Sequence, residues 1–233
     1  QGRWGCFLLR TPGALVLVDT GFGPGMGPYP AGGALLGALA SHGVMPADID
    51  LVVFSHLHPD HVMGTFDAAG EPVFEHAAYA CGAADWELFA DAAMAETFPW
   101  IGPQIAPLAG TRPGGGAYEL RLLPAGAEAD VVPGVTAIPA PGHSPGHTAL
   151  LVHSGGAEAL LAGDAFFHPA QLQHPDWHTE SDGDPAAATA TRRALIERVL
   201  DRNVLVGACH FPEPALGRAV SGPGGTVRWE PVR

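Results

Sequence analysis

A short apolar run, residues 51–54, leads directly into the heptapeptide Ser-His-Leu-His-Pro-Asp-His at residues 55–61. A continuous apolar run of this length predicts a strand that is buried on both faces. Imidazole nitrogen and carboxylate oxygen are ligands that zinc, iron, manganese and cobalt take in proteins. Pro59 and the close spacing make the chain curl, so that alternate side chains converge on one point. A plain His-rich surface loop is disfavoured because three histidines and an aspartate packed this closely would repel on protonation unless something ties them together. The sequence therefore predicts a metal site after this strand, with the candidate ligands His56, His58, Asp60 and His61.

Three further segments place residues of ligand type after expected strands. The turn Pro-Gly-His-Ser-Pro-Gly-His-Thr, residues 141–148, presents one histidine as a ligand and the other as a residue that stabilises the turn. The residues alone do not say which is which. Asp164 ends an apolar run, and His210 follows the expected strand 204–208. Each could be an ordinary turn or loop residue, but the motif at 55–61 favours ligand roles for both.

Composition excludes several classes of protein. Apolar residues make up 47% and charged residues 15%, which excludes a disordered chain. The net charge is −13 and the chain has no lysine, so neither nucleic acid nor an anionic membrane surface is an expected partner. No apolar run approaches the roughly 18 residues of a membrane span. Three widely spaced cysteines favour a reduced, cytoplasmic location. Because the sequence begins at Gln1, a secreted or periplasmic location is the alternative.

Turn signals and periodicity predict a layered protein in which strand-rich groups carry interspersed helices. Residues 99–117 read as a loop. We expect a hairpin at 6–10 and 14–18, helices at 34–42, 83–96 and 185–200, and strands at 51–54, 73–75, 119–123, 135–138, 149–153, 159–162, 204–208 and 226–230. Asp184 is the expected cap of the helix 185–200.

Taken in order, Asp19-Thr20-Gly21, the His-x-His-x-Asp-His motif, His143, Asp164 and His210 resemble the pattern of the metallo-β-lactamase superfamily. The resemblance extends from Asp19 to His210. It implies a single domain over residues 1–233 with an α+β, four-layer αββα sandwich fold. In that fold two mixed β-sheets are flanked by helices and the metals lie at one edge.

The resemblance also implies a role for each candidate residue. His56, His58 and His143 would hold one metal; Asp60, His61 and His210 would hold the second. Asp164 and a hydroxide would bridge two divalent ions, with zinc preferred and iron, manganese or cobalt as alternatives. Asp60 would also accept or shuttle a proton as the catalytic residue. Asp19 would orient the ligand loop, and His147 would support the turn.

The segment His-Phe-Pro-Glu-Pro-Ala-Leu-Gly, residues 210–217, is similar to the branch that contains methyl parathion hydrolase, lactonases and arylesterases. This branch implies a neutral or hydrophobic lactone, aryl ester or related phosphotriester as substrate, and a homodimer as a further expectation. Aspartate at 164, where penicillin-hydrolysing members have cysteine, argues against that activity. Pocket candidates, each of which could instead be an ordinary core or loop residue, are Phe22, Met26, Tyr29, Phe66, Phe166, Phe167 and His168.

Three other functions stay open at this point. A single-iron oxidoreductase of the same superfamily, similar to persulfide dioxygenases, would use a subset of these ligands. A thioester or phosphodiester hydrolase would carry out a different hydrolytic chemistry, and a metal-binding protein would have no catalysis. All seven ligand positions are filled, which favours two metals and hydrolysis.

Overall fold

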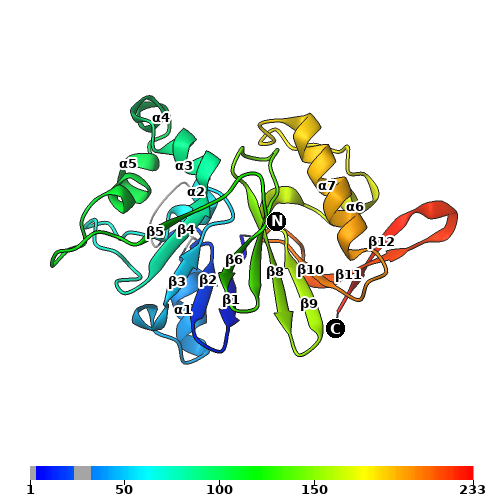
Figure 1. The fold of residues 1–233 in the computed structure, drawn as a ribbon, viewed down its shortest axis with the longest axis horizontal. Coiled ribbons are helices and arrows are strands. Elements are labelled where there is room, and N and C mark those ends of the chain that lie inside the picture. The colour runs from blue at the N-terminus through cyan, green and yellow to red at the C-terminus, as the bar shows by residue number, and fades with distance from the viewer. Residues whose placement is uncertain (1–3, 24–32, 233) are drawn as a thin grey trace. The chain divides into compact units, whose positions relative to one another are not determined.

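The computed structural model describes residues 4–23 and 33–232, which belong to two units. Residues 6–123 form the amino-terminal unit, and residues 124–233 with the segment before residue 6 form the carboxy-terminal unit. Each unit is built on its own β-sheet, and helices accompany both sheets (Figure 1).

The sheet of the amino-terminal unit has five strands in sequence order. The first two form the predicted antiparallel hairpin, and every later neighbour pair is parallel. The strands are β1 (Phe7–Arg10), β2 (Leu15–Val18), β3 (Leu51–Val53), β4 (Ala78–Gly82) and β5 (Leu120–Leu123). The helices are α1 (Ala34–Ser41), α2 (Pro59–Val62), α3 (Ala83–Phe89), α4 (Ala92–Thr97) and α5 (Ile101–Gln104), with short 3₁₀ turns at Pro46–Asp48 and Ala106–Ala109.

The direction of the strands places several polar candidate residues at one edge of this sheet. Because β2, β3 and β4 are parallel, their carboxyl ends meet at the same edge. Asp19 follows β2, residues 54–61 follow β3, and α3 follows β4. Leu17, Val52 and Tyr79 are among the buried residues that form the core of this unit.

The sheet of the carboxy-terminal unit has seven strands, and only β9 and β10 pair in parallel. In spatial order the strands are β12 (Val227–Pro231), β11 (Leu216–Ser221), β10 (Leu205–Gly207), β9 (Ala157–Leu161), β8 (Thr148–Ser154), β7 (Val135–Pro139) and β6 (Ala129–Val132). The helices are α6 (Ala170–Gln173) and α7 (Pro185–Val199), with 3₁₀ turns at Gly163–Ala165 and Pro223–Gly225.

This second sheet also collects candidate ligands at one edge. Strands β7 and β9 are both antiparallel to β8, so they run in the same direction, and β10 is parallel to β9. The segments that follow β7, β9 and β10 contain His143, Asp164 and His210, respectively. Helix α7 packs Leu195 and Val199 into the core of this unit.

Most predicted elements are confirmed, one predicted strand is wrong, and two further predictions are wrong in part. Residues 73–75 form a turn, and the strand comes later, at β4, because pairing with β3 and β5 outweighs the low strand propensity of its alanines and glycine. The helix predicted at 83–96 breaks at Ala90–Asp91, where Asp91 caps α4 by accepting from the backbone N of Ala93. The loop predicted at 99–117 contains α5 and a 3₁₀ turn.

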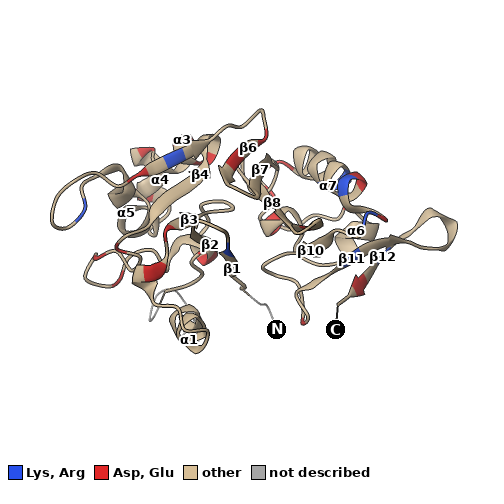
Figure 2. Cartoon of the chain, turned by 60° about the horizontal axis from the view of Figure 1, so that its bottom comes forward, with Lys and Arg blue, Asp and Glu red and all other residues tan. Residues whose placement is uncertain are grey.

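Charged side chains lie in both units. Arginines occur on β1 of the amino-terminal unit and on β11 and α7 of the carboxy-terminal unit, and α7 carries three of them (Figure 2). None of the helices within residues 4–23 and 33–232 has the length and hydrophobicity needed to cross a membrane.

The cap of α7 gives a test of how this unit is stabilised. The Asp184 carboxylate accepts a hydrogen bond of 3.0 Å from the backbone N of Ala187. We expect Asp184→Ala to lower the free energy of unfolding by about 1 kcal/mol in a urea titration, because the helix loses this acceptor. Asp176→Ala, at an exposed position, is the matched control and should leave the unfolding midpoint unchanged; an equal loss in both variants would contradict the capping role.

Candidate metal centre

The loop after β3 brings three imidazole rings together in the amino-terminal unit. The ring centroid of His56 lies 4.5 Å from that of His58 and 4.0 Å from that of His61. His56 and His61 are buried, and His58 is half-buried. Pro59 occupies the first turn of α2, where its fixed φ suits a helix start, and Asp60 and His61 follow in the same turn as further candidate ligands. One Asp60 oxygen lies 3.6 Å from Nε2 of His61.

Asp19 holds this loop in place through hydrogen bonds. Its Oδ1 accepts from the backbone N of Ser55 at 2.7 Å, and its Oδ2 lies 2.8 Å from Nδ1 of His61. Because a carboxylate only accepts, Nδ1 of His61 carries the proton and Nε2 presents the lone pair. Thr20 donates from its backbone N and its hydroxyl to the carbonyl of His61, at 2.7 and 2.9 Å. His61 is therefore fixed at both its ring and its backbone.

A second buried carboxylate, Asp85, supports the same loop and was not singled out from the sequence. It lies in the first turn of α3, and its Oδ2 accepts from the backbone N of Leu57 at 3.2 Å. An acidic residue in the first turn of a helix is expected on electrostatic grounds alone. Nothing in its local sequence therefore distinguishes Asp85 from an ordinary helix-start acid.

In the carboxy-terminal unit, Asp164 presents its two oxygens to different partners. Oδ2 lies 3.4 Å from Nε2 of His143 and 3.1 Å from Nε2 of His210. Oδ1 accepts a hydrogen bond of 2.7 Å from the Cys209 thiol, a residue to which the sequence analysis gave no role. One oxygen thus faces two imidazoles, and the other is held in place by the thiol.

The two histidines of the turn 141–148 make different contacts. Nε2 of His147 accepts from the backbone N of Asp164 at 2.9 Å, so this ring holds the aspartate turn. His143 instead points Nε2 at the Asp164 carboxylate and Nδ1 at Oδ1 of Asp182, 3.3 Å away. These contacts support His143 as the ligand and His147 as the supporting residue.

Asp182 is a further residue that sequence reasoning missed. Burial by itself raises the pKa of its carboxyl, but hydrogen bonds from His143 and Arg192, together with the Arg192 charge, hold that pKa well below its usual range. The carboxylate is therefore ionised and accepts from His143. In the sequence Asp182 sits in a Ser-Asp-Gly-Asp segment that reads as a polar loop before a helix.

Helix α7 fixes the backbone of the His143 turn. Gly142 has a φ of +133°, and a Cβ there would lie 2.2 Å from the backbone N of Ala188. The carbonyl of Gly142 accepts from the backbone N of Asp184 at 2.8 Å, and the Thr191 hydroxyl donates to the carbonyl of Pro141 at 2.6 Å. Only glycine allows this close approach of turn and helix.

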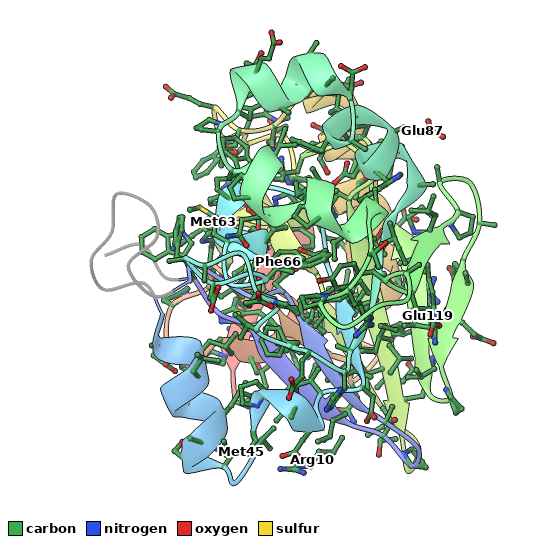
Figure 3. All side chains as sticks on the ribbon, turned by 90° about the vertical axis from the view of Figure 1, so that its left-hand side faces the viewer. Arg10, Met45, Met63, Phe66, Glu87 and Glu119 are labelled. Carbon is green, nitrogen blue, oxygen red and sulfur yellow. The ribbon has the colours of Figure 1, made fainter. Side chains whose placement is uncertain are left out.

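The predicted pocket residues have different surroundings. Phe167 stacks on the ring of His210, with centroids 4.1 Å apart, and so lies beside candidate ligands. Phe66 (Figure 3) and Phe166 are fully buried in the cores of their units. Phe22 is also buried, and His168 is exposed, with its Nδ1 accepting from the backbone N of Ala170. The remaining two candidates, Met26 and Tyr29, lie outside the described residues.

The chemistry of the donors fits divalent metal ions. Imidazole nitrogens and carboxylate oxygens suit zinc and its neighbours in the first transition row. His61 and His143 each direct Nδ1 at a buried carboxylate, which is the arrangement that orients a histidine toward a metal through Nε2. In the carboxy-terminal unit, ligand-type atoms of Asp164, Cys209 and His210 lie within 4.8 Å of one another.

Fold and residues together define a member of the metallo-β-lactamase superfamily, whose family model matches residues 6–210. The chain therefore belongs to this superfamily of metal-dependent hydrolases, and the predicted α+β fold with two mixed sheets and helices is confirmed. The human metallo-beta-lactamase domain-containing protein 1 is 31% identical over 223 residues, which cover 93% of this chain and 67% of that protein.

Solved structures of two other proteins share the fold. One is described as the hydrolase AbOPH of the beta-lactamase superfamily, with a TM-score of 0.83 over 100% of this chain and 80% of that chain. The other is AidC, a dizinc quorum-quenching lactonase, with a TM-score of 0.80 and the same coverage of both chains. Each is 24% identical to this chain, so the likeness concerns the fold.

The contact between Asp19 and His61 gives a test of the candidate metal centre. We expect Asp19→Asn to weaken zinc binding by about 10- to 100-fold, because an amide no longer offers two charged oxygens to hold the protonated Nδ1. Asparagine tolerates the positive φ of 62° at this position, so the backbone is preserved. Competition with a chromophoric chelator measures the affinity. Asp176→Asn, at an exposed position, is the control, and equal zinc affinity in both variants would contradict this role.

Proposed function

We propose that this protein is a hydrolase that uses two divalent ions, preferably zinc, to cleave the bond of a lactone, aryl ester or related ester. The observation that carries the proposal is the position of Oδ2 of Asp164, within 3.4 Å of Nε2 of both His143 and His210. A single carboxylate oxygen that faces two imidazoles is well placed to be shared between two ions.

The proposed ligand sets follow the pattern of the family. One ion is held by His56, His58 and His143, and the other by Asp60, His61 and His210, with Asp164 shared. The assignment is supported by the gathering of three imidazole rings in one unit and by the Asp164 contacts in the other. The single domain over residues 1–233 stays a prediction.

The residues of the chain have distinct tasks in this proposal. When bound, two such ions supply Lewis acidity and a water of lowered pKa. Asp60, on the first turn of α2, accepts the proton of the attacking water as a general base. Asp19 and Asp182 hold the protons on Nδ1 of His61 and His143, so that Nε2 of each ring stays available. None of these tasks needs a serine or cysteine nucleophile.

Phe167 supports a hydrophobic substrate. Its ring stacks on His210 at an interplanar angle of 15° and lies 5.7 Å from the ring of His143. An apolar ring next to the ligands favours a substrate with an aromatic or apolar group beside its scissile bond. The relatives described as a hydrolase and a dizinc lactonase are consistent with this class. A phosphotriester is the related substrate in which a phosphoryl centre replaces the carbonyl. The cytoplasmic location and the homodimer stay predictions.

A substrate panel tests the proposal. Bound metal is removed from the protein with a chelator, and the protein is then reloaded with zinc. It is assayed on 4-nitrophenyl esters, aryl lactones and a 4-nitrophenyl phosphotriester. We expect ester or lactone hydrolysis that disappears on chelation and returns with zinc. Asp60→Asn should lower kcat by about 100-fold or more, because the proton acceptor is lost.

The matched control for this panel is Asp67→Asn, an exposed aspartate of the same unit, which should keep full activity. The proposal is contradicted if zinc-loaded protein hydrolyses none of the three substrate classes. It is also contradicted if Asp60→Asn and Asp67→Asn hydrolyse the substrate equally fast.

A further inference from the structure

Arg192 on α7 is the one arginine among the described residues whose side chain is fully buried. Burying a guanidinium removes it from water at a large cost, and a buried ion pair seldom recovers more than that cost. A buried arginine is therefore poorly explained by stability alone. Its neighbour on the same helix, Arg193, is exposed.

The guanidinium of Arg192 joins three separate segments of the carboxy-terminal unit. Nε donates to the carbonyl of Ala165 at 2.6 Å, the residue directly after Asp164. One terminal nitrogen donates to the carbonyl of Trp177 at 2.9 Å. The other donates to Oδ2 of Asp182 at 2.8 Å, while Oδ1 of the same carboxylate faces Nδ1 of His143.

These contacts connect two candidate ligands through one rigid group. A path of two hydrogen bonds runs from Arg192 through Asp182 to the ring of His143. A second path runs from Arg192 to the backbone carbonyl that follows Asp164. Because the guanidinium is planar, its donors have fixed directions, and both paths are set by one orientation of one side chain.

We infer that Arg192 is a positioning residue that sets the placement of His143 relative to Asp164 for metal binding, an inference that rests on the proposed function. Lysine has three donors on one nitrogen and cannot bond the carbonyls of Ala165 and Trp177 and the Asp182 carboxylate in the same geometry. The positioning role therefore needs arginine itself, and positive charge alone does not supply it.

A purely structural role makes different predictions. If Arg192 only holds α7 against the loops, a folded variant should melt at a lower temperature but bind zinc as tightly as the wild type. If Arg192 positions the ligands, a folded variant should bind zinc more weakly and should also change the tautomer of His143 in the metal-free protein. Tautomer and affinity are therefore the deciding measurements.

The experiment compares Arg192→Lys and Arg192→Met with Arg193→Met, the same substitution at the exposed neighbouring position. We expect zinc affinity, measured by competition with a chromophoric chelator, to fall about 10- to 100-fold in both Arg192 variants and to stay unchanged in Arg193→Met. Arg192→Met leaves Asp182 buried without its cation, whereas Arg192→Lys keeps the positive charge. If Arg192→Met does not fold, the zinc affinity of Arg192→Lys decides the outcome.

Nitrogen-15 NMR of the metal-free proteins gives a readout that does not depend on activity. The wild type should show His143 protonated at Nδ1, with the signal assigned by its loss in His143→Gln. The folded Arg192 variants should show a mixture of tautomers. Folded variants with zinc affinity within twofold of the wild type and an unchanged His143 tautomer would overturn the inference. A wild type that binds no zinc while its His143 signal responds to Arg192→Lys would instead count against the proposed function.

Discussion

Strand direction is the constraint on which the candidate metal centre depends. In the amino-terminal unit, the parallel run of β2, β3 and β4 brings Asp19, the histidine loop and the start of α3 to one edge of the sheet. In the carboxy-terminal unit, β7, β9 and β10 run in one direction, so the segments with His143, Asp164 and His210 also share an edge. Rigid strand ends hold polar side chains with little freedom to move, as a preorganised site requires.

Buried carboxylates then orient the histidine side chains that the strands bring together. Asp19 adopts a left-handed backbone at φ +62°, which aspartate and asparagine tolerate better than most residues other than glycine, and its bonds to Ser55 and His61 hold it there. Asp182 plays the corresponding part for His143 and is itself held by Arg192. In each unit a buried carboxylate lies against Nδ1 of a histidine and so fixes the orientation of its ring. The same contact, used twice, gives Nε2 of both candidate ligands a defined direction.

Local spacing explains how much could be predicted from the sequence. The motif at 55–61 was recognisable because its ligands lie within six residues of one another, and the helix at 185–200 because its cap and first proline are adjacent. Residues whose partners are distant in the sequence could not be recognised in this way. Asp85 contacts Leu57, 28 residues earlier, and Asp182 contacts His143, 39 residues earlier. The strand at 78–82 was missed for a similar reason, because partners distant in sequence, rather than its own propensity, decide it.

The proposed function rests on a pair of ions that share Asp164, and X-ray absorption at the zinc edge tests this pair most directly. For zinc-loaded protein with two ions per chain by elemental analysis, the account predicts a metal–metal distance of about 3.5–4 Å. This metal–metal signal should disappear in His143→Ala, which removes one ligand of the first ion. Two bound zinc ions without a metal–metal signal, or a single ion per chain, would contradict the claim.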